Sequence, residues 1–97
     1  MPNIELYGFD SDTECAKIVK RKVRKAVTNL GLEDETVITT LKVEVESLGM
    51  ARTQFIRVCS DQQDEISDII KGLKAVKIGC DVEILLISNF VSAENMQ

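Results

Sequence analysis

The sequence contains no histidine and no tryptophan, and only 4% of its residues are aromatic. Without histidine, neither a Ser-His nor a Cys-His nucleophile can form, and the commonest zinc ligand is missing. The three cysteines, Cys15, Cys59 and Cys80, form no CxxC pair. An odd number of cysteines without metal spacing is typical of free thiols in a reducing compartment. We therefore expect no metal, no cofactor and a cytoplasmic location.

Long apolar runs are also missing. No run approaches the ~20 residues that cross a bilayer. The first ten residues, MPNIELYGFD, have neither the basic start nor the long apolar segment of a signal peptide. We expect no membrane partner. At 97 residues, of which 44% are hydrophobic, the chain has the size of one domain with one core.

The net charge of −4 is unevenly distributed. Segment 17–25 holds six of the twelve basic residues and no acidic residue, so the rest of the chain is strongly acidic. A basic stripe of this kind can contact phosphate or an anionic lipid surface. No aromatic stacking residue or glycine-rich loop accompanies this stripe. We therefore interpret it as a solvated helix face and expect no nucleic-acid partner.

In the first half of the chain, alternating apolar and polar residues predict a strand over Ile4–Phe9. The segment Ser11–Glu14 has the pattern of a capping box, which predicts a helix that starts there. Gly31 is placed to end this helix. A long alternating strand is predicted over 37–45. The residues expected to form the buried face of the helix are Cys15, Ile18, Val19, Val23, Ala26, Val27 and Leu30.

The second half repeats this layout. A short connection at 47–50 leads to a predicted strand over 52–59, and Ser60–Gln63 forms a second capping box. Gly79 is the expected end of the helix, and a last strand is predicted over 82–90. The expected apolar face of this helix consists of Ile66, Ile69, Ile70, Leu73 and Val76. Because each half runs strand, helix, glycine, strand, the chain reads as a duplicated unit.

The element order β-α-β-β-α-β predicts a single α/β (α+β) domain over 1–97, with unit one at 1–46, unit two at 52–91 and a tail at 92–97. It predicts a two-layer sandwich of two βαβ units, in which a four-stranded sheet carries both helices on one face. The last strand is apolar on both faces, so we expect self-association to cover it. The residues expected on the open sheet face are Glu5, Tyr7, Lys42, Glu44, Phe55, Arg57, Leu85 and Ile87.

The layout carries a family resemblance over nearly the whole chain. The segments concerned are Met1-Pro2 before strand Ile4–Phe9, the helix start Ser11–Glu14, the helix end Asn29–Gly31, the loop Glu33–Thr36 before strand Val37–Val45, and the strand-helix-strand unit Phe55–Ser88. In these segments the chain resembles the tautomerase superfamily, the group of 4-oxalocrotonate tautomerase and macrophage migration inhibitory factor. The resemblance implies two βαβ units and a homotrimer whose sheets line a central barrel.

The resemblance gives Pro2 the role of catalytic base once Met1 has been removed. A free α-amino group titrates near ~8, and an apolar pocket or a nearby positive charge lowers that pKa. The amine can then take a proton next to a carbonyl and return it elsewhere, which is keto–enol tautomerisation of a small carbonyl or enol substrate. The candidate site is thus Pro2 as the catalytic residue, with Tyr7, Lys42 and Arg57 as candidates for substrate binding.

The chain departs from the family pattern near four substrate-binding positions. Asp10, Leu32 and Ile38 stand near basic residues of the family, and Glu83 stands near its pocket aromatic. Two hypotheses remain. The first is a tautomerase/isomerase, with the family activity or an altered one. The second is a non-catalytic ferredoxin-like binding or regulatory module that acts as an oligomer. The short link at 47–50 favours the second, because it suits a direct hairpin.

Overall fold

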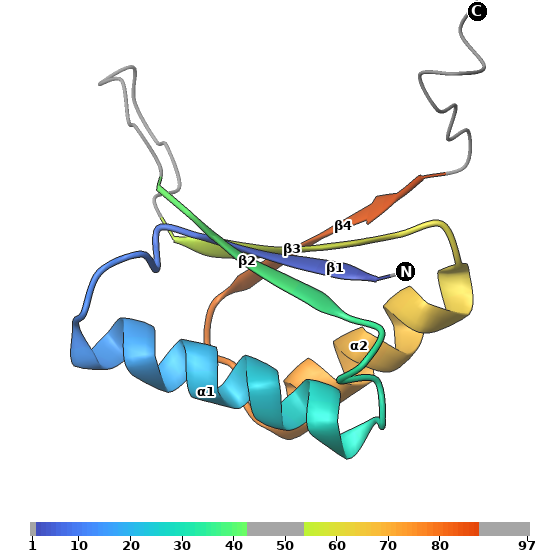
Figure 1. Ribbon diagram of the computed structural model, residues 1–97, viewed down its shortest axis with the longest axis horizontal. Coiled ribbons are helices and arrows are strands. Elements are labelled where there is room, and N and C mark those ends of the chain that lie inside the picture. The colour runs from blue at the N-terminus through green and yellow to red at the C-terminus, as the bar shows by residue number, and fades with distance from the viewer. Residues whose placement is uncertain (1, 43–53, 88–97) are drawn as a thin grey trace, which may run out of the picture.

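The computed structural model describes residues 2–42 and 54–87. Four strands form one mixed sheet, and both helices cover the same face of it (Figure 1). The elements are β1 (Asn3–Tyr7), α1 (Glu14–Asn29), β2 (Val37–Leu41), β3 (Phe55–Ser60), α2 (Gln63–Ala75) and β4 (Asp81–Leu86). The predicted order and two-layer architecture are therefore confirmed. Among the described residues, no helix is long and apolar enough to cross a membrane.

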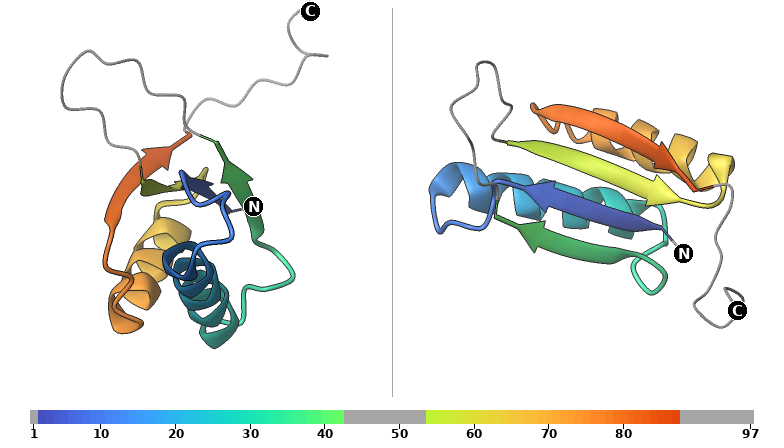
Figure 2. Two further views of the ribbon diagram at one scale, coloured as in Figure 1. Left: turned by 90° about the vertical axis from the view of Figure 1, so that its left-hand side faces the viewer. Right: turned by 90° about the horizontal axis from the view of Figure 1, so that it is seen from above.

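The strand order β2-β1-β3-β4 decides between the two predicted folds (Figure 2). Strand β1 runs parallel to β2 and antiparallel to β3, and β3 runs parallel to β4. Because β1 separates β2 from β3, the hairpin of a ferredoxin-like sheet does not form, and that alternative is wrong. The physical reason lies in the pairing of β2, which forms a parallel ladder with β1 on the edge of β1 that faces away from β3. The fully buried side chains Ile4, Leu6, Ile56 and Val58 belong to the two central strands, β1 and β3.

The two predicted capping boxes are wrong in detail. Thr13 caps α1, and its Oγ1 accepts a hydrogen bond from the Ala16 N–H at 3.3 Å. Ser11 lies two residues before this cap, with its Oγ 3.1 Å from Thr13 Oγ1. Gln62 is the first residue before α2, and Ser60 is the last residue of β3. The Ser60 hydroxyl accepts from the Gln62 N–H at 3.0 Å, so it joins the strand end to the helix start.

Both helices end in a Schellman motif, in which two N–H groups donate back to carbonyls of the last turn at 3.0 to 3.2 Å. Gly31 holds the left-handed position after α1, with φ +70°, as predicted. After α2 this position belongs to Lys77, with φ +54°, and not to Gly79. The prediction was wrong because it assumed that glycine, the usual residue in a left-handed conformation, would hold this position. Here Lys77 adopts that conformation, although it is unfavourable for a residue with a side chain.

The hydrophobic core lies between the helices and the sheet. The predicted phase of α1 was off by one residue at its start, because Cys15 and Ile18 are exposed while Ala16 is fully buried. In α2, Ile66, Ile69 and Leu73 are buried as predicted. The buried residues of this core are Ile4, Leu6, Phe9, Ala16, Val19, Val23, Ala26, Val27, Ile56, Val58, Ile66, Ile69 and Leu73.

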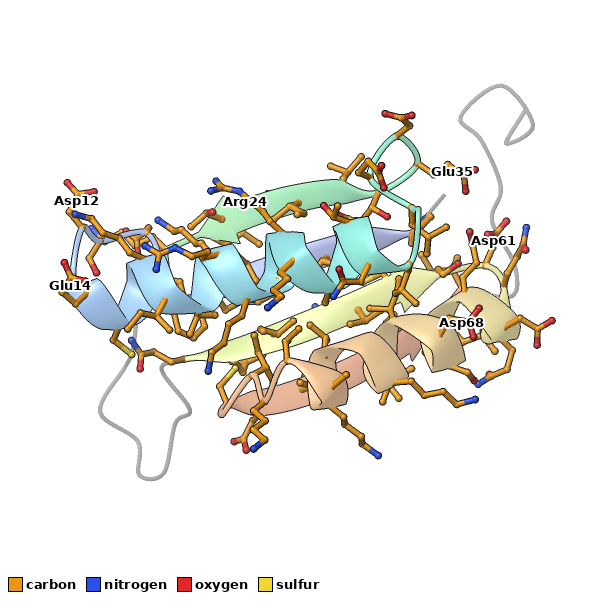
Figure 3. All side chains as sticks on the ribbon, turned by 90° about the horizontal axis from the view of Figure 1, so that it is seen from below. Asp12, Glu14, Arg24, Glu35, Asp61 and Asp68 are labelled. Carbon is orange, nitrogen blue, oxygen red and sulfur yellow. The ribbon has the colours of Figure 1, made fainter. Side chains whose placement is uncertain are left out.

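Strand bounds are shorter than predicted where the structure describes them. Strand β1 ends at Tyr7 because Gly8 turns the chain, with φ +82°, and Phe9 points into the core. The outer face of α1 presents the basic stripe, of which Arg24 is labelled in Figure 3. Predicted features that lie outside the described residues are the link at 47–50, Glu44, the unit bounds at 46, 52 and 91, the last part of the strand at 82–90, and the tail at 92–97.

Candidate active site

The sheet face turned away from the helices carries three rows of side chains. Alternation along each strand selects the residues, and the register aligns them across the sheet. The middle row consists of Thr39, Glu5, Arg57 and Glu83. The rows on either side of it are Leu41, Tyr7, Phe55 and Asp81, and Val37, Asn3, Cys59 and Leu85.

Arg57 lies between two carboxylates of the middle row. Its Nη2 and Nε donate to Glu83 Oε2 at 3.3 and 3.4 Å. Its Nη1 lies 4.0 Å from Glu5 Oε1 on the other side. The side chains of Arg57, Glu5 and Glu83 are 33%, 20% and 29% exposed, so these ion pairs are partly shielded from water. The positive charge of Arg57 is therefore offset within the protein.

Two aromatic rings hold the guanidinium in place. Tyr7 and Phe55 are stacked, with ring centroids 4.6 Å apart and an angle of 8° between the planes. The Arg57 Cζ lies 5.2 Å from the Tyr7 centroid and 6.0 Å from the Phe55 centroid. Arg57 Nη1 also donates to the Tyr7 hydroxyl at 3.3 Å. The structure thus brings together two of the predicted site residues, Tyr7 and Arg57.

A cavity of about 540 Å³ opens on this face, where β1 begins and where β3 and β4 end. Its volume is that of a site for a small molecule. Apolar walls come from β4 and the residue after it, and polar groups come mainly from β1 and β3. The lining residues are Asn3, Glu5, Arg57, Cys59, Ser60, Asp61, Leu85 and Ile87.

Pro2 lies at the start of β1, next to this cavity. It directly precedes Asn3, which lines the cavity, while the Pro2 ring itself is fully buried. The Pro2 carbonyl accepts a hydrogen bond from the Val37 N–H at 3.1 Å. In the described part of the chain, Asn3 Oδ1 and Thr36 Oγ1 are buried atoms without a hydrogen-bond partner. The start of β1 is therefore a largely desolvated environment.

Lys42 lies apart from this cavity. It is exposed, directly follows β2, and is not among the residues that line the cavity. In the observed register Leu41 lies opposite Tyr7, so alternation puts Lys42 on the same side as Ile38. Ile38 packs against the core, and the prediction that Lys42 lies on the open face is therefore wrong. The two faces of β2 differ little in polarity. The prediction therefore turned the face with Ile38 and Lys42 away from the helices, whereas in the structure this face packs toward them.

The Cys59 thiol lies in the cavity wall but is not an activated nucleophile. Its side chain is buried, and its Sγ donates to Glu5 Oε1 at 3.3 Å. Burial first, and then the hydrogen bond and charge of Glu5, raise the pKa of Cys59 from 9.0 to about 11, although Arg57 opposes this. The thiol is therefore neutral at physiological pH and unreactive. No group of three or more potential metal ligands gathers in the described ranges 2–42 and 54–87.

Sequence reasoning did not identify Glu5, Cys59 and Glu83 as members of the site. Alternation alone puts these residues on one face. Their contact with Arg57 depends on which strands are neighbours, and only the register shows this. The sequence did contain a signal, which is one acidic residue on each of β1 and β4, Glu5 and Glu83, and a basic residue, Arg57, on β3. This pattern predicts ion pairs only once β3 is known to lie between β1 and β4.

Comparisons with known proteins concern the fold. No protein-family model matches the sequence, and a search of curated proteins finds no similar sequence. Among solved structures, the F6 fused 4-OT wild-type asymmetric trimer aligns with a TM-score of 0.56 and 12% identity, over 94% of this chain and 92% of that chain. The R7 fused 4-OT wild-type asymmetric trimer aligns with a TM-score of 0.51 and 15% identity, over 95% of this chain and 91% of that chain. Both are tautomerase-superfamily proteins, so the resemblance is confirmed at the level of the fold.

Proposed function

We propose that this protein catalyses keto–enol tautomerisation of a small carbonyl compound, with the amine of Pro2 as the general base after removal of Met1. The observation that carries the proposal is the position of Pro2. It directly precedes β1 at the end of the sheet where the cavity opens, one residue before the lining residue Asn3. The tautomerase-like fold supports the same assignment.

The chemistry needs only the substrate and this amine. A processed Pro2 has a secondary amine, and its buried environment favours the neutral form, which lowers the amine pKa from ~8 toward neutrality. The neutral amine takes a proton from the carbon next to a carbonyl. The electron pair of the broken C–H bond forms a C=C bond, and the carbonyl oxygen gains a negative charge. Pro2 then returns the proton to that oxygen or to another carbon.

Arg57 is the residue that can stabilise the charged oxygen. A guanidinium has five N–H bonds, and three of those of Arg57 donate to Glu83 and Tyr7. Two remain to face an enolate oxygen, which is the charge that develops during the reaction. The apolar side chains Leu85 and Ile87 provide contacts for the rest of the substrate.

We further propose that the active form is a homotrimer in a reducing cytoplasm. Strand β4 lies at the edge of the sheet and is followed directly by Ile87. An apolar edge strand is a surface that another chain covers by pairing with it. The three thiols are free, which suits a reducing compartment. The exposed apolar side chains here are Ile84, Leu85, Leu86 and Ile87, with 55%, 46%, 42% and 37% of their surface accessible.

Mass spectrometry and kinetics test the proposal together. The intact mass shows whether Met1 is absent, and the mass under native conditions counts the subunits. Ketonisation of 2-hydroxymuconate, which is itself an enol, and of the enols of phenylpyruvate and methyl phenylpyruvate is then compared for the wild type and Pro2→Ala. We expect the variant to lose roughly 10²- to 10⁴-fold in rate, the usual contribution of a general base. A matched control inserts one residue before Pro2, which keeps the ring but leaves its nitrogen in a peptide bond. Equal rates for all three proteins on every substrate would rule the proposal out.

A further inference from the structure

One of the two edges of Arg57 that can bind a carboxylate through paired N–H groups is already occupied. A carboxylate is bound most tightly by two parallel N–H groups of one guanidinium. Here the Nε and Nη2 groups, which form one such pair, both donate to Glu83 Oε2 at 3.4 and 3.3 Å. Nη1 donates to the Tyr7 hydroxyl and lies 4.0 Å from Glu5 Oε1. Arg57 is also the only cationic residue among the described residues that line the cavity.

The carboxylates beside Arg57 would repel an anionic substrate. Glu5 lines the cavity, and Glu83 lies directly across from Arg57 on β4. A substrate carboxylate placed on the guanidinium would meet both negative charges at short range in a partly shielded site. A like charge at such a distance shifts an equilibrium by roughly tenfold or more, because the effective dielectric constant is below that of water. Among the other lining residues, Asp61 is a further acidic residue, Leu85 and Ile87 offer apolar contact, and Asn3, Cys59 and Ser60 carry no positive charge.

We infer that the cavity takes uncharged carbonyl compounds, such as esters, amides or ketones with an apolar group, in preference to carboxylates of the same shape. This inference rests on the proposed role of Pro2. The enolate oxygen is a different case from a carboxylate, since its charge develops only during the reaction. It needs one or two N–H donors, and Arg57 retains two beyond the three that donate to Glu83 and Tyr7.

A matched pair of substrates tests the preference. Phenylpyruvate and methyl phenylpyruvate share the ring, the reacting carbon and the keto group, but the ester lacks the negative charge. With the processed protein, and after subtraction of the uncatalysed rates, we expect kcat/KM for the ester to exceed that for the acid by about tenfold or more. Raising the salt concentration should reduce this ratio, because salt screens the repulsion.

Glu83→Gln should weaken the hold on the Nε and Nη2 groups of Arg57, because an amide oxygen is a neutral acceptor, and it removes one negative charge. The acid-to-ester ratio of kcat/KM should then rise by roughly tenfold. Glu5→Gln should shift the ratio in the same direction, and it serves as the second variant if Glu83→Gln disturbs β4. Asp68→Asn is the matched control, because it removes one carboxylate from the exposed face of α2, away from the cavity (Figure 3). The ratio should be unchanged in this control.

Binding to the Pro2→Ala variant separates this inference from the proposed function. Ligand-observed NMR measures the affinity of both compounds without any turnover. If Pro2→Ala tautomerises as fast as the wild type but binds the ester more tightly than the acid, the role of Pro2 is wrong and the charge preference stands. If the acid binds or reacts as well as the ester, or if neither Glu variant changes the ratio, the charge preference is wrong.

Discussion

The Cys59 thiol should react with alkylating reagents about a hundredfold more slowly than an ordinary cysteine. Only the thiolate reacts. The pKa of Cys59 is raised from 9.0 to about 11, by burial first and then by Glu5. At pH 8 the thiolate is then about one molecule in a thousand, whereas a thiol of normal pKa has about one in ten. Because the pKa is raised, the rate should keep rising tenfold per pH unit until about pH 11.

The measurement is timed labelling with iodoacetamide, followed by digestion and mass spectrometry of the three cysteine peptides. Exposed Cys15 serves as the internal reference. Glu5→Gln should speed the labelling of Cys59 several-fold, because it removes a carboxylate that raises the thiol pKa and leaves Arg57, which lowers it. Cys59 should still be labelled more slowly than Cys15 in this variant, because burial is the larger cause of its raised pKa. Glu35→Gln, in an exposed loop, is the control (Figure 3). Labelling of Cys59 as fast as that of Cys15 at pH 8 would refute this account of the cavity.

Four further predictions concern stability and assembly. Lys77→Gly should raise the free energy of unfolding by about 0.5–1 kcal/mol in urea denaturation, because Lys77 has φ +54°. Gly31→Ala should lower it by about 1 kcal/mol through conformation alone, because its added Cβ would meet no atom within 4 Å. Thr36→Val should raise it by about 1 kcal/mol, because Thr36 Oγ1 is buried without a partner among the described residues; a loss would show that the hydroxyl is bonded in solution. Ile84→Lys should yield folded monomers in native mass spectrometry, since Ile84 is 55% exposed on the edge strand.

The architecture could be predicted because many residues encode it redundantly. The apolar periods of 2 and 3.6 residues recur along every element, so a few ambiguous positions do not change the element order. Helix starts are less certain, because Ser11 and Thr13 are both good caps and stand two residues apart. Strand order could not be read locally, since it depends on contacts between residues far apart in the sequence. The link at 47–50 suggested a hairpin, but β3 pairs with β1.

The candidate site could be predicted only in part. Alternation put Tyr7 and Arg57 on one face, and the structure confirms that they are in contact. Lys42 was assigned to the wrong face, because one choice of face decides the side of every residue in a strand. The roles of Glu5 and Glu83 follow from the register, which the sequence pattern does not contain.

Glu83 shows why the fold and the chemistry of this sheet are separable. The helix-facing side chains of the central strands, Ile4, Leu6, Ile56 and Val58, are fully buried, and a change there would cost packing. Residues between them point to the open face, where a carboxylate is tolerated because Arg57 lies opposite and forms a cross-strand pair. Substitutions on the open face can therefore change its charge and shape, for example to the Glu5–Arg57–Glu83 row, without disturbing the core. Similarity of fold thus reflects the side chains on the helix-facing side of the sheet. The substrate has to be inferred from the charged side chains on the open face.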